Sequence, residues 1–328
     1  MNRLLDRYAV VFVAVAATLW ASDAYFRNQL VQHLSATQIV VAEDALVTLF
    51  LLPVLIRSRH ELRLLGARGW TAVGIIAAGA QALATILFTA SFSIAAQHQL
   101  FAETFVLQQT QPLIAIFLAW VVLGERRRPW FWPAAAVAIV AVYMVVFASD
   151  PFSPVSALQN GRLEVGLLAL GAAVLWASGT VLGRFALGSI SFWSMTALRF
   201  TLALPVLVVV VVVQSRGLSG FSHYQVSDFV PNLLAIALVP GLLALLLYYR
   251  ALSKTPASMA TIAEMAYPVA ATLIASAPPP WGFNQPIYAA QLVGTALLLG
   301  VIVFLNWTRE KAPPVIVTRP LSVAEGST

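Results

Sequence analysis

The 328-residue chain contains no cysteine, so disulfides, thiolate metal ligands and cysteine nucleophiles are excluded. Its four histidines are scattered, and the sequence predicts neither a metal site nor a cofactor. Charged residues are also scarce, at 10% of the chain against about 25% in a typical soluble domain. The hydrophobic share is 60%, more apolar surface than a soluble fold of this length could bury. The composition therefore predicts an integral membrane protein whose apolar surface is in contact with the lipid bilayer.

The apolar runs are continuous rather than alternating, which favours membrane helices over a β-barrel. A bilayer core needs about 20 apolar residues per helix. This length predicts ten transmembrane helices, at residues 8–27, 37–56, 70–92, 100–123, 131–147, 165–184, 192–213, 230–249, 257–276 and 287–306. The first run lacks a small-residue cleavage site, so we expect a retained helix and not a signal peptide.

The basic residues are distributed unequally between the two predicted sides of the membrane. With both termini cytoplasmic, the outer loops hold Arg27, Arg162 and Arg216. The inner loops hold 15 basic residues, namely Arg3, Arg7, Arg57, Arg59, Arg63, Arg68, Arg126, Arg127, Arg128, Arg184, Arg250, Lys254, Arg309, Lys311 and Arg319. This positive-inside bias predicts a multi-pass protein of the inner (plasma) membrane with both termini cytoplasmic. It also explains the net charge of +6, so no nucleic-acid partner is expected.

The sequence repeats itself at an offset of 156 residues. Leu19-Trp20-Ala21-Ser22 recurs as Leu175-Trp176-Ala177-Ser178, and the same offset places Pro112 on Pro268. Five helices per copy is an odd number, so the second copy must enter the membrane in the opposite orientation. The predicted fold is an all-α membrane protein of two inverted five-helix repeats around a central cavity, an arrangement that suits alternating access. The expected boundaries are 1–148 for the first repeat, 149–163 for a linker loop, 164–307 for the second repeat and 308–328 for a disordered cytoplasmic tail.

Polar residues at membrane depth are costly and are therefore functional candidates. Gln108 and Gln111 lie on one helix face just before Pro112, and the offset maps them to Glu264 and Tyr267 just before Pro268. We expect this stripe to face a wet cavity, and each proline to kink its helix and free a backbone carbonyl one turn earlier. In the alternative interpretation, the glutamines only form hydrogen bonds from helix to helix.

Glu264 lies alone near the middle of its span, without a basic residue within one turn. A buried carboxyl of this kind can carry a proton or serve as the counter-charge of a cationic group. Glu103, on the fourth predicted span, is a second candidate for proton coupling. The alternative role of Glu264 is that of a neutral acid that holds two helices together.

Trp20 and Trp176 occupy the same place in the two inverted copies, and hence opposite depths in the bilayer. That relation suits a shared central site better than an interfacial aromatic belt. Tyr248 extends the same aromatic wall or belongs to the belt, and Gln81 on the third span is a further cavity candidate.

Five other charged residues lie within the predicted spans. Asp23 and Arg27, at positions i and i+4, should form a local ion pair. Asp44 and the adjacent Glu43 lie two turns into the second span from the outer side, at a depth too different from that of Arg199 for direct pairing. Arg199 should extend to the inner headgroups, as arginines near helix ends do.

The chain resembles the drug/metabolite transporter superfamily in four features. These are the ten spans, the two five-helix copies, the repeated Leu-Trp-Ala-Ser and the sequence Leu123-Gly124-Glu125-Arg126 that follows Pro112. The chain is similar to its ten-helix, two-repeat metabolite exporters, including bacterial aromatic amino acid exporters, over residues 8 to 307. The second copy lacks the Gly-Glu-Arg element after Pro268. The resemblance implies that helices one, three, four, six, eight and nine surround a central cavity. This would place eight residues near the substrate: Trp20, Gln81, Gln108, Gln111, Trp176, Tyr248, Glu264 and Tyr267.

These observations predict a transporter, not an enzyme, that exports small organic metabolites such as amino acids by alternating access, with proton coupling through Glu264 or Glu103. We expect a monomer with a small-molecule substrate. One alternative is a transporter of organic cations, held in an aromatic cage by Trp20, Trp176, Tyr248 and Glu264. A distant alternative is an intramembrane lipid-modifying enzyme, although no nucleophile, metal cluster or carboxylate pair converges on one face.

Overall fold

The computed structural model describes residues 8–98, 110–123, 129–146, 162–222, 224, 226–278, 281 and 289–307. Within these residues the regular structure is helical, and six helices are long and apolar enough to cross a membrane. They are Ala9–Leu30, Ala36–Arg57, Ala67–Ile94, Glu164–Ala186, Phe192–Gln214 and Val230–Leu252. The all-helical membrane fold is therefore confirmed, while the count of ten spans stays a prediction.

The first half of the chain supplies the helices that precede the predicted linker. They are α2 (Ala9–Ala21), α3 (Asp23–Leu30), α4 (Ala36–Arg57), η1 (Glu61–Leu64), α5 (Ala67–Ile75), η2 (Ile76–Leu83), α6 (Ala84–His98), α8 (Gln111–Leu123) and α9 (Phe131–Val146). The second half supplies α10 (Arg162–Ala186), α11 (Phe192–Gln214), η4 (Ser219–Phe221), α12 (Val226–Ile236), η5 (Ala237–Leu243), α13 (Ala244–Leu252), α14 (Ala257–Ala263), α15 (Ala266–Ser276) and α16 (Ala289–Trp307).

The predicted linker, 149–163, extends slightly too far, because α10 already begins at Arg162. The tail at 308–328 lies outside the described residues. The remaining domain boundaries stay predictions.

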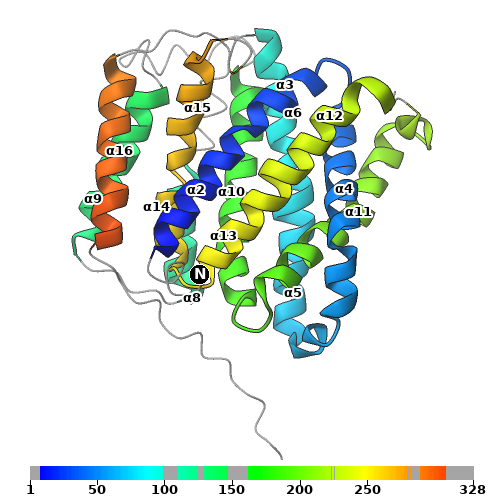
Figure 1. Ribbon diagram of the computed structural model, residues 1–328, viewed down its shortest axis with the longest axis horizontal. Helices are drawn as coiled ribbons and strands as arrows, with labels where there is room; N and C mark the ends of the chain where they lie inside the picture. Colours follow the sequence, from blue (N-terminus) through cyan, green and yellow to red (C-terminus); the bar gives the residue numbers. More distant parts are fainter. Residues whose placement is uncertain are drawn as a thin grey trace, which may run out of the picture.

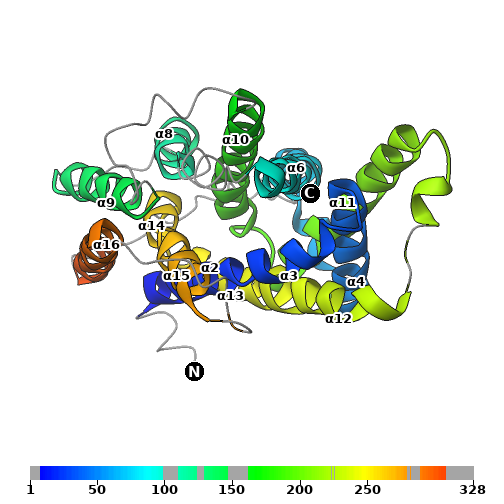
Figure 2. The same ribbon diagram turned by 90° about the horizontal axis from the view of Figure 1, so that it is seen from above.

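Each packed pair of helices has an equivalent pair, which is found by replacing each helix with its counterpart from the other half of the chain. Helix α2 packs on α13, and its counterpart α10 packs on α6, the counterpart of α13 (Figures 1 and 2). Helix α4 packs on its own counterpart α11, and α9 packs on its own counterpart α16. Contacts of this kind are expected when two copies of one unit are related by a pseudo-two-fold axis.

The turns after the first helix of each half have the same pattern of backbone hydrogen bonds. Two successive amides donate to the carbonyl of Leu30 at the end of α3, and two donate in the same way to Ala186 at the end of α10. Ser35 then caps α4 with φ −67° and ψ 158°, and Ser191 caps α11 with φ −67° and ψ 157°. The two serines are 156 residues apart, so the sequence repeat is also a repeat of local structure.

Two short helices dock on these capped helix ends, each from the other half of the chain. In η1, Glu61 accepts a 2.7 Å hydrogen bond from the amide of Ser191 at the start of α11. At the start of α4, the side-chain amide of Gln38 donates a 2.6 Å hydrogen bond to the carbonyl of Gly220 in η4. Burial alone would raise the pKa of Glu61, but the hydrogen bonds from Ser191 outweigh it and lower the pKa below its ordinary value.

The third and eighth predicted spans each contain a π-helical stretch, η2 and η5. The π-helix is rare and frequently lies at functional sites. Gly241 lies in η5, where a β-carbon would come within 2.9 Å of the carbonyl of Ile236 and 3.4 Å of Oε1 of Glu43. A glycine is therefore required in η5, because a β-carbon would collide with the backbone carbonyl of Ile236 in the preceding turn.

The ninth predicted span is interrupted between α14 and α15, at Glu264 and Met265. Pro268 has no amide hydrogen, so it cannot donate to the carbonyl of Glu264 four residues earlier. The prediction that this carbonyl would be free is wrong, because the amide of Tyr267 donates to it at 2.9 Å. The tighter turn therefore satisfies the carbonyl and positions the Glu264 side chain at the interruption.

Candidate functional site: a cavity shared by both halves

A cavity of about 170 Å³ lies between the two halves of the chain. Its wall includes seven of the eight residues predicted to lie near substrate: Trp20, Gln81, Gln111, Trp176, Tyr248, Glu264 and Tyr267. The eighth, Gln108, and the second proton-coupling candidate, Glu103, lie outside the described residues. The structure thus brings the predicted residues together, whereas their roles in binding stay predictions.

The aromatic part of the wall has the same geometry in both halves. The rings of Trp20 and Tyr248 lie 5.0 Å apart at 51°, and those of Trp176 and Phe88 lie 5.2 Å apart at 53°. Tyr248 is only 3% exposed, so its alternative placement in an interfacial belt is wrong. Phe88 was not predicted, although it lies one helical turn before Phe92, the position aligned with Tyr248.

Gln111 and Glu264 connect the two halves across the cavity. The side-chain amide of Gln111, in α8, donates a 2.8 Å hydrogen bond to Oε2 of Glu264. The other oxygen, Oε1, is buried and has no hydrogen-bond partner among the described residues. The contact is the helix-to-helix bond of the alternative interpretation, yet both residues also line the cavity. Pro112 is the second residue of α8, and the kink predicted there stays untested, since residues 99–109 lie outside the described part of the chain.

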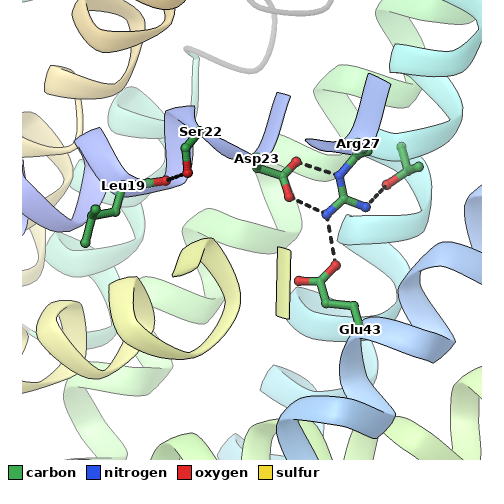
Figure 3. A network of polar contacts seen from close by, with 6 residues as sticks. Leu19, Ser22, Asp23, Arg27 and Glu43 are labelled. Carbon is green, nitrogen blue, oxygen red and sulfur yellow. Dashed lines mark hydrogen bonds and ion pairs between the residues drawn. The ribbon is translucent and has the colours of Figure 1, made fainter. Parts of the chain in front are cut away.

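Arg27 organises a polar network at one side of the cavity (Figure 3). It binds both carboxylate oxygens of Asp23, at 2.5 and 2.6 Å, which confirms the predicted local pair. It also donates to Glu43 at 2.9 Å and to the hydroxyl of Thr89 at 3.1 Å. These last two contacts could not be predicted from the sequence, because they join helices whose relative rotation is set only by packing.

Arg199 does not extend to the headgroups, and the prediction that it would is wrong. Its guanidinium lines the cavity and donates to Oε1 of Gln81 at 2.5 Å, to the Tyr249 hydroxyl at 2.9 Å and to the carbonyl of Ala80 at 3.2 Å. These three neutral acceptors solvate the charge inside the protein, so it does not need the membrane surface. Among the described residues, no carboxylate lies within ion-pair distance of Arg199, as predicted for Glu43 and Asp44.

Gln81 connects Arg199 to the second span. While its oxygen accepts from Arg199, its amide nitrogen donates to Oδ1 of Asp44 at 2.8 Å. Asp44 is fully buried behind the cavity wall, and its Oδ2 has no hydrogen-bond partner among the described residues. The amide of Gln81 therefore separates a guanidinium on the wall from a carboxyl behind it.

The wall combines indole and phenol rings, two amides and charges of both signs. Such a surface can hold an amphipathic organic molecule, with its apolar part on the rings and its polar groups on the amides and charged side chains. Among the described residues, no three His, Cys, Asp or Glu side chains are grouped as a metal site would require.

Comparison with known proteins agrees with this architecture. One relative is the riboflavin transporter ImpX of Fusobacterium nucleatum subsp. nucleatum, which is 29% identical over 172 residues, 51% of this chain and 55% of the relative. The match thus spans just over half of that relative's length. A crystal structure of a protein superposes with a TM-score of 0.65 at 16% identity, covering 90% of this chain and 95% of the other. At that identity the likeness shows the fold alone.

The model of the EamA-like transporter family matches the chain twice, at residues 7–147 and 165–307. These two matches cover most of the chain and correspond to the two copies found from the 156-residue offset. The protein is therefore a member of the EamA-like transporter family, a family of transporters and not of enzymes, and it has two EamA domains.

Proposed function

We propose that this protein exports a small organic metabolite across the inner membrane by alternating access between two oppositely inserted halves. One observation carries the proposal: Trp20 and Trp176, equivalent residues of the two copies, lie on the wall of one cavity. A site built from matched positions of two copies is what two inverted repeats enclose.

The proposed topology has ten spans, both termini in the cytoplasm and the two repeats inverted. Figure 1 supports the inversion, since the turn between α3 and α4 lies at the upper end of the molecule and the equivalent turn between α10 and α11 lies at the lower end. The polypeptide functions as a monomer in this proposal, because its cavity is lined by the two halves of one chain.

The absence of native cysteine makes this topology directly testable. His33 and Ser189 occupy equivalent positions of the two turns, 156 residues apart. A membrane-impermeant maleimide added to intact cells should label His33→Cys, whereas Ser189→Cys should react only after the cells are opened. Labelling of both variants from the same side would refute the inverted arrangement.

The proposed substrate is an amphipathic neutral solute such as an amino acid. The rings of Trp20, Trp176, Tyr248 and Phe88 would contact its apolar part, and Gln111 would hydrogen-bond its polar groups. Uptake of labelled amino acids into liposomes that contain the purified protein tests this proposal. Failure of all amino acids to cross, together with transport of another solute, would overturn the substrate assignment and leave the transport function intact.

Two other substrates are supported by specific observations. An organic cation would use the same rings and the Glu264 carboxyl as its cage, and its binding would be lost in Glu264→Gln, whereas amino acid binding would be retained. Riboflavin, named in the relative with 29% identity, has a planar ring system that suits the aromatic wall. Competition by quaternary amines or by riboflavin in the same uptake assay separates these candidates.

Proton coupling through Glu264 completes the proposal, with Glu103 as the second candidate. Oε1 of Glu264 lies on the cavity wall without a hydrogen-bond partner in the described part of the chain, which supports a site where a proton is taken up and released. Uptake into liposomes should respond to an imposed pH gradient in the wild type and not in Glu264→Gln. Equal uptake by the wild type with and without the gradient would identify a uniporter.

A further inference from the structure

Asp44 has no assigned role, yet it is one of the most completely buried charged groups of the described chain. It does not line the cavity, and its Oδ1 is bound by the amide of Gln81 while its Oδ2 has no hydrogen-bond partner among the described residues. A buried carboxylate with an unpaired oxygen is costly, and protonation removes most of that cost. The carboxyl of Asp44 is therefore a place where a proton can reside.

The Gln81 amide gives this proton a means of acting on the cavity. Its nitrogen points toward Asp44 and its oxygen toward Nε of Arg199, so an ionised Asp44 and the guanidinium polarise the amide in the same direction. Asp44 and Arg199 therefore behave as an ion pair whose interaction is relayed through the side-chain amide of Gln81. When Asp44 is neutral, the positive charge of Arg199 loses its relayed partner and becomes more available to a ligand in the cavity.

The other charged groups that interact with Asp44 do not replace this relay. Glu43, its neighbour on α4, is bound by Arg27 from α3, and Arg27 also neutralises Asp23. Arg199 from α11 is the remaining cation that interacts with Asp44, and among the described residues it has no carboxylate in direct contact. The charge of Arg199 is therefore shared between Asp44 behind the wall and a ligand in front of it.

We propose that Asp44 is a proton-binding site coupled through Gln81 to Arg199, so that a proton on Asp44 and an anionic group of the substrate on Arg199 bind cooperatively. The inference rests on the proposed transport function and adds the chemistry of one substrate group and a proton site distinct from Glu264. Because linkage is reciprocal, a carboxylate at Arg199 promotes proton uptake by Asp44 to the same extent.

The experiment uses 3-phenylpropionate as an anionic probe and 3-phenylpropanol as its neutral counterpart, both chosen for the aromatic wall. Binding to the purified full-length protein is measured by tryptophan fluorescence at pH 8 and pH 5.5. Wild-type protein should bind 3-phenylpropionate about tenfold more tightly at pH 5.5, a difference of about 1.4 kcal/mol. The affinity for 3-phenylpropanol should not change with pH.

Variants assign the effect to individual groups. Asp44→Asn, which imitates the neutral acid, should bind the anion tightly at both pH values, and Gln81→Leu, which cuts the relay, should also lose the pH dependence. Arg199→Gln should bind the anion weakly at both pH values. Glu264→Gln should retain the pH dependence, and Glu61→Gln, in η1 outside the cavity, serves as the matched acid control. If Asp44→Asn does not fold, Gln81→Leu carries the test alone.

Three outcomes would overturn the inference. One is pH dependence that disappears in Glu264→Gln and persists in Asp44→Asn, and another is equal weakening of both probes by Arg199→Gln. The third is absence of 3-phenylpropionate binding by the wild type. None of these outcomes affects the proposed transport function, which fails separately if the His33→Cys and Ser189→Cys labelling places both turns on one side.

Discussion

The side-chain amide of Gln111 donates a 2.8 Å hydrogen bond to Oε2 of Glu264, although the two residues are 153 positions apart and belong to different halves. A polar contact of this kind joins the α8 and α14 helices at the point where the ninth predicted span is interrupted. It makes the cavity wall continuous across the boundary of the two repeats.

Replacement of Gln111 by Leu should destabilise the protein by about 1–3 kcal/mol, because it removes the hydrogen-bond donor of a carboxylate oxygen. Thermal unfolding of the purified protein measures the loss. Combining Gln111→Leu with Glu264→Leu should cost less than the sum of the two single changes, as expected for contacting residues. Strict additivity would show that the hydrogen bond contributes nothing.

Arg27→Met should be more damaging, since it leaves Asp23 and Glu43 at membrane depth without their cation. Removal of one partner from a buried ion pair costs about 3–5 kcal/mol. Glu43→Gln should cost less, because Asp23 still pairs with Arg27 in that variant. Arg250→Met, which removes a partly buried arginine stacked on Phe192, is the matched control. An apparent melting temperature of Arg27→Met equal to that of the control would contradict the assigned role of the network.

Gly179→Ala should separate α10 from η2. A β-carbon on Gly179 would lie 2.5 Å from that of Ala80, closer than two non-bonded carbon atoms can approach. Overpacking of this kind costs about 1–3 kcal/mol, measured as a lower unfolding temperature. Gly74→Ala is the matched control, because nothing lies within 4 Å of its added methyl group, and it should leave stability unchanged or raise it. Equal stability of the two variants would mean that the helices separate without cost.

The Glu61 contact predicts a pH-dependent difference between two proteins. Because hydrogen bonds lower the pKa of Glu61, the ionised carboxylate stabilises the folded state above the ordinary glutamate pKa, and this contribution is lost as the pH falls through the lowered value. Glu61→Ala should therefore unfold at a lower temperature than the wild type at pH 7, with a loss of about 1 kcal/mol or less in the free energy of unfolding, since the group is only partly buried. At low pH the two melting temperatures should converge. A difference that is constant with pH would show that the charge of Glu61 is irrelevant.

The sequence was sufficient for features that repeat or that lie within one helix. The offset of 156 residues identified both tryptophans, Glu264 and Gln111, because equivalent positions of two copies must meet at a shared centre. The Asp23–Arg27 pair followed from helix periodicity alone. By contrast, the placement of Arg199 depends on Gln81, 118 residues away, and on the local rotation that the π-helical stretch gives to that residue. Neither quantity can be read from spacing along the chain.

The two π-helical stretches have a consequence for how this protein can diversify. A π-helical turn holds one residue more than an α-helical turn, and one residue corresponds to about 100° of rotation. Deleting a single residue between Ile76 and Leu83 would restore the regular helix and turn Thr85 and Phe88 away from the cavity. A change of length by one residue in η2 or η5 could thus exchange the whole set of side chains presented to a solute, without a single substitution in the wall itself.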